Sequence, residues 1–156
     1  MGKENPISEA KKIMRQQYHS IETEKGKLVW DVNKLIELVK NLPVIELSLK
    51  DIKELDEAYW HEEGGWKKPI ARDIALHAKL IYETDLDYPI ILHSDGRIMD
   101  GMHRCCKALI LGHTTIKAVR FENDSVPHFV DPNWDDLPYE DNFQDVLKHF
   151  GLPYKD

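Results

Sequence analysis

Cysteine is scarce in this chain of 156 residues, and its two cysteines, Cys105 and Cys106, are adjacent. Neighbouring positions on a helix point in different directions, so these thiols are poorly placed to form a disulfide with each other. The chain therefore lacks the disulfide framework of small secreted proteins, and we expect a reducing, cytoplasmic setting. We interpret both cysteines as small core residues, with a redox role as the less favoured alternative.

Long apolar runs are also missing. No stretch approaches the roughly 18 apolar residues of a transmembrane helix, so we expect no membrane association. The first ten residues, MGKENPISEA, contain no apolar segment of the kind that secretory signals carry. Hydrophobic residues nevertheless make up 42% of the chain, which is enough for a core and excludes a disordered protein.

The chain also has no excess of basic residues. The tail, residues 122–156, has nine acidic residues against two lysines, which accounts for the whole net charge of −7 and leaves the first 121 residues neutral. Proteins that bind nucleic acid normally carry a basic surface, so this distribution argues against a nucleic-acid partner. The acidic tail could instead be a surface for a protein partner.

The spacing of apolar residues predicts a single α+β domain, with helices around a small mixed sheet. The predicted parts are N-terminal helices within 1–42, a core over 43–121 and an acidic extension over 122–156 that ends in a helix. The predicted helices cover residues 6–18, 31–42, 50–58, 70–81, 102–112 and 141–150. The predicted strands are 43–49, a hairpin over 88–101 that turns at residues 94–96, and 114–121. Polar connecting segments are expected over 20–30 and 122–140.

Several polar and aromatic residues outside these strands have two interpretations. His77 shares a predicted apolar helix face with Ile74, and we interpret it as a core histidine rather than as a site residue. The tryptophans are interpreted as packing residues. The segment WHEEGG, residues 60–65, is interpreted as a solvated loop. Its alternatives are a lid hinged at two glycines, or a local metal cluster.

The segment from Asp100 to Arg104, with the sequence DGMHR, carries the most chemical groups in the shortest distance. It falls between a predicted strand and a predicted helix, where unpaired backbone N–H groups and the helix dipole favour an anion. Gly101 would let the backbone approach a phosphate, and Arg104 and His103 would contact its oxygens. Asp100 could hold Mg²⁺ or take a proton from a hydroxyl group. The alternative is a plain turn, in which Asp100 caps the helix and Arg104 lies on the surface.

Residues 43–121 resemble the ParB/sulfiredoxin-like superfamily. This segment consists of PVIELSL, a predicted helix and then YPIILHSDGRIMDGMHRCCKALILGHTTIKAVRF. The turn at 100–104 reads Gly-Glu-Arg-Arg in ParB proteins and Gly-Gly-Cys-His-Arg in sulfiredoxins. It reads Asp-Gly-His-His-Arg in free-serine kinases, whose form is the most similar to this one. Sulfiredoxin chemistry needs a cysteine where this chain has Met102, and ParB proteins need a DNA-binding domain that follows the core.

The resemblance implies that Gly101, Met102, His103 and Arg104 bind the phosphates of ATP, ADP or CTP. It also implies basic groups near the helix that precedes the hairpin, for which the candidates are Lys67, Lys68 and Arg72, with Lys68 and Arg72 preferred. A carboxylate after the first strand is implied as well, and Glu54, Asp56 and Glu57 lie there. Asp56 and Glu57 are the candidates for a catalytic role beside Asp100 and His103.

The function that these residues favour is that of a Mg²⁺-dependent phosphotransferase or nucleotide hydrolase acting on a small polar substrate. One alternative is a non-catalytic module that senses nucleotides or binds a protein. A third is a ParB-like nuclease, against which the neutral core and the acidic tail both argue.

Overall fold

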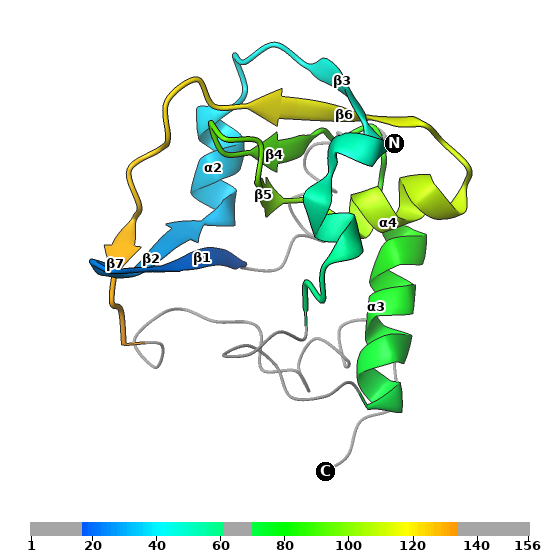
Figure 1. The fold of residues 1–156 in the computed structure, drawn as a ribbon, viewed down its shortest axis with the longest axis horizontal. Coiled ribbons are helices and arrows are strands. Elements are labelled where there is room, and N and C mark those ends of the chain that lie inside the picture. The colour runs from blue at the N-terminus through cyan, green and yellow to red at the C-terminus, as the bar shows by residue number, and fades with distance from the viewer. Residues whose placement is uncertain (1–16, 61–69, 134–156) are drawn as a thin grey trace, which may run out of the picture. The chain divides into compact units, whose positions relative to one another are not determined.

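The structure is a computed structural model that describes residues 17–60 and 70–133. These residues form a mixed α+β structure with three α-helices and two small sheets, which confirms the predicted fold class at this level (Figure 1). They belong to two compact units, one holding residues up to 33 and from 127 onward, the other residues 34–126. The single-domain organisation stays a prediction. The helix predicted over 141–150 and residues 6–16 of the helix predicted over 6–18 lie outside the described residues. The predicted end of the latter is wrong, because Tyr18 begins a strand.

The first unit contains a three-stranded sheet with the strand order β1-β2-β7. Strands β1 (Tyr18–Thr23) and β2 (Gly26–Asp31) form an antiparallel hairpin, and β7 (Phe129–Val130) pairs with β2. The prediction of a polar connector over 20–30 is therefore wrong. β1 is too polar to be recognised by itself, and it is held in place by its backbone bonds to β2. The predicted irregular stretch over 122–140 likewise contributes a strand.

Helix α2 (Val32–Leu38) confirms the helix predicted over 31–42, although it is shorter. Asp31 caps it as predicted, because its Oδ1 accepts a hydrogen bond from the backbone N–H of Asn33 at 2.9 Å.

The second unit contains a four-stranded sheet with the order β3-β6-β4-β5. Its strands are β3 (Ile45–Ser48), β4 (Ile90–Leu92), β5 (Ile98–Asp100) and β6 (Thr115–Arg120). β6 runs parallel to β4, whereas the β3–β6 and β4–β5 pairs are antiparallel. All four strands lie where the sequence predicts them. The hairpin closes as predicted, with the N–H of Gly96 donating to the carbonyl of His93 at 2.9 Å.

Helices α3 (Ala71–Glu83) and α4 (Met102–Ile110) pack against each other in this unit (Figure 1). Lys107 on α4 joins them at one end, since its Nζ donates to the carbonyl oxygen of Thr84 at 2.6 Å. The predicted apolar face of α3 is wrong in part. Ile70, just before the helix, and Ile74 are 57% and 60% exposed, and Leu76 is the buried residue, because α4 covers a different side of α3.

The core of the second unit lies between the sheet and α4. Its buried members come from β4, β5, β6, α4 and the segment after β3, and they are Leu49, Ile52, Ile90, Leu92, Ile98, Met102, Cys105, Ala108, Ile116 and Ala118. α4 ends as predicted, with Gly112 in the left-handed region at φ 78° just past its last residue.

Two short 3₁₀ turns, η1 (Leu49–Asp51) and η2 (Lys53–Asp56), replace the single helix predicted over 50–58. They anchor this segment to the β4–β5 hairpin through two carboxylates. The buried carboxylate of Glu54 accepts a hydrogen bond from the backbone N–H of Ile98. The more exposed Glu57 accepts two bonds from the Arg97 guanidinium, at 2.7 and 2.8 Å.

We expect Glu54→Ala to lower the free energy of unfolding by about 2 kcal/mol, because it leaves the buried N–H of Ile98 without an acceptor. Glu57→Ala is the matched control. It removes a carboxylate from the same segment, but one that is exposed to solvent, so it should shift the unfolding midpoint far less. Urea unfolding followed by circular dichroism measures both. Equal midpoint shifts would show that Glu54 does not anchor the segment.

Candidate functional site

The turn between β5 and α4 has the strand–turn–helix geometry that the sequence predicts. Gly101 is the N-cap of α4, at φ 119° and ψ 20°, and no side chain in the described part of the chain forms a capping hydrogen bond there. A Cβ atom at Gly101 would lie 2.5 Å from Cγ2 of Ile90, so the turn has room only for glycine. The positive end of the α4 dipole is therefore not neutralised by a side-chain cap.

A bulge in β5 sets the direction of Asp100. Ile91 pairs with Asp100 and Leu92 pairs with Ile98, so Met99 is an extra residue between two paired positions. Ile98 and Met99 are both buried at 2% exposure, although consecutive strand residues normally point to opposite faces.

The carboxylate of Asp100 is bound to Arg104, one helical turn further on. Its Oδ2 lies 2.8 Å from Nη2 of Arg104, and the two side chains are 17% and 15% exposed. Asp100 is thus an ion-pair partner rather than a helix cap, and Arg104 is not a surface residue, which contradicts the plain-turn alternative. The Arg104 Nε is buried and has no hydrogen-bond partner among residues 17–60 and 70–133. Such an orphaned donor is rare in folded proteins and often marks a place where a ligand or water belongs.

The side chain of Met102 points into the core and is not available to contact a ligand. It is 5% exposed and belongs to the core cluster, so of this predicted phosphate-binding residue only the backbone could contact an anion. Cys105 is fully buried in the same core, and burial raises the pKa of its thiol to about 12. Burial also raises the pKa of Cys106. Neither thiol is a nucleophile near neutral pH, in agreement with their interpretation as core residues.

His103 is in contact with two residues that the sequence analysis does not assign to the site. Its Nε2 lies 2.8 Å from Nδ1 of His77 on α3. The indole of Trp60 stacks on both imidazoles, with ring centroids 4.1 Å from His77 and 4.7 Å from His103. The interpretation of His77 as a core residue is wrong, because α3 and α4 bring it beside His103. We call these three residues the histidine–tryptophan cluster.

The carboxylates predicted to be catalytic are not joined to this turn in the described residues. Asp56 is exposed on η2, and Glu57 is held by Arg97, whose hydrogen bonds lower the pKa of Glu57. Tyr59 is a further residue whose hydroxyl is affected by the charge of Asp100. Burial raises the pKa of its hydroxyl strongly, and the negative charges of Asp100 and Glu54 raise it further. Tyr59 is not among the residues that the sequence predicts for the site, and its only signal there is an aromatic pair, Tyr59-Trp60, after the carboxylates.

Of the predicted basic residues before the hairpin, the structure describes Arg72, which is exposed in the first turn of α3. Lys67 and Lys68 lie outside the described residues, as do residues 61–65. Within residues 17–60 and 70–133, no group of three histidine, cysteine or acidic side chains could hold a metal ion. Asp100 alone, already bound to Arg104, does not make a protein-only magnesium site.

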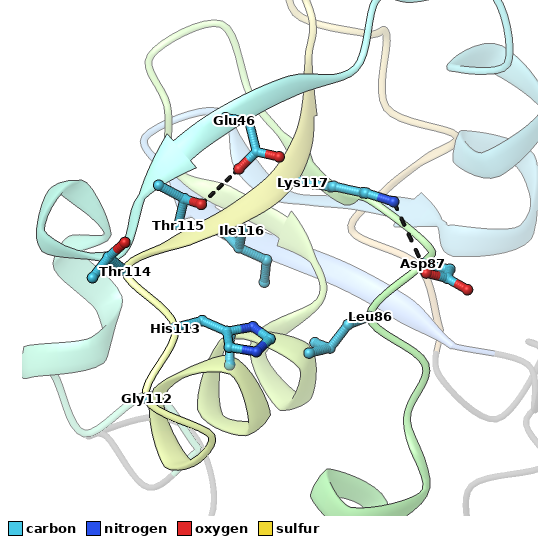
Figure 2. Close-up of a pocket in the computed structure, with 10 residues that line it drawn as sticks. Glu46, Leu86, Asp87, Gly112, His113, Thr114, Thr115, Ile116 and Lys117 are labelled. Carbon is cyan, nitrogen blue, oxygen red and sulfur yellow. Dashed lines mark hydrogen bonds and ion pairs between the residues drawn. The ribbon is translucent and has the colours of Figure 1, made fainter.

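A cavity of about 500 Å³ opens at the other end of α4 (Figure 2). Its polar contacts are between its own lining residues: Thr115 Oγ1 donates to Glu46 at 2.6 Å, and Lys117 lies 3.9 Å from Asp87. Among the described residues, none of those predicted for the site lines this cavity.

No family model, curated protein or solved structure matches this chain. No helix in the described part of the chain is long and apolar enough to cross a membrane.

Proposed function

We propose that the turn between β5 and α4 binds the phosphates of a nucleotide, within a fold of the ParB/sulfiredoxin-like kind. The observation that carries the proposal is the helix start itself. It has no side-chain cap from the residues that the structure describes, it has room only for glycine at the N-cap, and it is followed by His103 and Arg104. A phosphate would accept hydrogen bonds from backbone N–H groups at the positive end of the dipole. Arg104 would add a permanent charge, and ATP, ADP and CTP are the candidate ligands.

We propose that the reaction is a Mg²⁺-dependent phosphoryl transfer to a small polar substrate, or hydrolysis of the nucleotide, in the cytoplasm. Asp100 is the carboxylate of the turn that could either contact Mg²⁺ bound to the phosphates or take a proton from the attacking hydroxyl. It would have to give up its bond to Arg104 to do so. His103 would stabilise charge on the transferred group, and Asp56 or Glu57 would complete the acidic set.

A non-catalytic nucleotide-sensing module is the second candidate, and the ion pair at the turn favours it. The carboxylate of Asp100 is bound to Arg104 at 2.8 Å. In this arrangement it would hold the phosphate-binding arginine in place rather than act as a general base. In that case, the acidic tail would be the surface for a protein partner, and nucleic acid would not be one.

Calorimetry with ATP, ADP and CTP in the presence of Mg²⁺ tests the binding, and we expect one of them to bind the folded protein. The absence of binding to all three would contradict both candidates.

Asp100→Asn separates the two candidates. This substitution removes the negative charge that binds Arg104 but keeps the shape of the side chain at position 100. We therefore expect nucleotide affinity to be retained or increased about threefold, which corresponds to less than 1 kcal/mol. If the protein is an enzyme, product formation in a metabolite screen should fall at least 100-fold, since a general base typically contributes that much. If it is a sensor, the slow turnover of the unchanged chain should not alter. Arg97→Lys, which keeps a positive charge at the hairpin, serves as the control.

A further inference from the structure

The two imidazoles of the histidine–tryptophan cluster meet edge to edge. Nδ1 of His77 lies 2.8 Å from Nε2 of His103, their planes differ by 23° and their centroids are 5.1 Å apart. These values describe two rings that lie side by side in nearly one plane, joined nitrogen to nitrogen. The indole of Trp60 covers both rings at angles of 25° and 23°. The three rings therefore fix one another across 26 residues of sequence between α3 and α4.

A hydrogen bond between two imidazole nitrogens needs a proton on one of them and a lone pair on the other. Either His77 donates from Nδ1, or His103 donates from Nε2. If both rings became imidazolium, two N–H groups and two positive charges would face each other at this distance, which would break the bond. While the bond holds, the pair carries at most one positive charge. The other ring remains neutral.

We infer that His77 is a positioning residue for the phosphate site: it fixes the ring orientation and the protonated nitrogen of His103. This inference rests on the proposed function. His103 lies in the first turn of α4, next in sequence to Arg104 of the Asp100–Arg104 ion pair. A ring that rotated there would present a donor in one state and an acceptor in another. Because phosphate oxygens accept hydrogen bonds, the nitrogen of His103 that contacts a phosphate must carry a proton. The bond to His77 and the cover of Trp60 hold the ring in one orientation before any ligand arrives.

Two substitutions of His77 separate the hydrogen bond from the packing. His77→Phe keeps an aromatic ring for Trp60 but has no nitrogen. His77→Asn loses the ring but places an amide close to the position of Nδ1, where it can donate or accept. Nucleotide affinity is measured by calorimetry with ATP, ADP and CTP and Mg²⁺. The protonated nitrogen of His103 is identified by ¹H–¹⁵N correlation spectra of the imidazoles, with the His103→Gln spectrum assigning the signals.

We expect one tautomer of His103 to dominate in the unchanged protein. His77→Phe should mix the tautomers and weaken nucleotide binding about tenfold, the size of one hydrogen bond to a charged group. His77→Asn should recover most of that affinity. An unchanged His103 spectrum in His77→Phe, or unchanged affinity in a protein that binds nucleotide, would overturn the inference.

The imidazole spectra also distinguish this inference from the proposed function. If the unchanged protein binds none of the nucleotides while His103 keeps one tautomer, the proposed function fails and His77 has no phosphate site to serve. If nucleotide binds while His103 shows mixed tautomers before and after His77→Phe, the proposed function stands and the role of His77 fails.

Discussion

Gly101→Ala is expected to lower the free energy of unfolding by about 3 kcal/mol. The backbone at Gly101 has φ 119°, a region that L side chains adopt only with strain. The added methyl group would also lie 2.5 Å from Cγ2 and 2.9 Å from Cβ of Ile90, which is fully buried and cannot rotate away. Strain and overpacking each cost on the order of 1–3 kcal/mol, so this change combines two separate penalties. Chemical unfolding followed by circular dichroism measures it.

Gly112→Ala is the matched control for this prediction. Gly112 also has a positive φ, of 78°, but a methyl group there would meet nothing within 4 Å. It should therefore cost only the backbone strain, about 1 kcal/mol. If the two variants lose the same stability, then the contact with Ile90 does not restrict the turn, and the close approach of backbone to strand β4 is not what makes glycine necessary at 101.

Arg104→Met is expected to weaken nucleotide binding about 100-fold. Methionine keeps the aliphatic part of the side chain, which packs at the helix start, and removes the guanidinium that would contact the phosphates. Loss of one partner of a partly buried, hydrogen-bonded charge contact costs about 2–5 kcal/mol, and 100-fold, about 2.7 kcal/mol, lies in the lower part of that range. Calorimetry with the nucleotide that binds the unchanged protein provides the measurement.

Two controls make this result specific. Arg97→Met removes a guanidinium that binds Glu57 on the hairpin, and it should leave the affinity within about twofold, below 1 kcal/mol. The double variant Asp100→Asn/Arg104→Met removes both members of the ion pair, so that no carboxylate is left alone in the turn. If the double variant binds nucleotide as tightly as the unchanged protein, Arg104 serves only to neutralise Asp100 and the phosphate site lies elsewhere.

The parts of the fold that the sequence predicts correctly are those encoded by neighbouring residues. The apolar run of β4, the turn at Gly96 and the stop at Gly112 each depend on a few adjacent positions, and all three are confirmed. Strand β1 is missed because its residues are mostly polar and its place is determined by pairing with β2. Short polar strands have little intrinsic preference, so pairing decides them.

At the site, the order of residues 100–104 predicts the turn but not which side chains meet there. The helical spacing that His77 shares with Ile74 predicts a core residue, but the side of α3 that α4 covers depends on packing between distant residues. The orientation of the carboxylates after β3 is also not encoded by neighbouring residues alone. Two 3₁₀ turns bury Glu54 and leave Asp56 exposed, whereas one regular helix would have oriented them differently.

The extra residue at Met99 has a consequence for how this site can change in evolution. Side chains on a strand point alternately to the two faces of the sheet. The number of residues between Ile98, which pairs with Leu92, and the turn therefore decides to which face the side chain of Asp100 points. Deletion of one residue there would leave every chemical group of the motif in the chain and yet rotate the acid away from its arginine. Keeping the ion pair therefore requires the right number of residues in β5 as well as the right residue types. A comparison of residue types alone would not reveal that the pair had been lost.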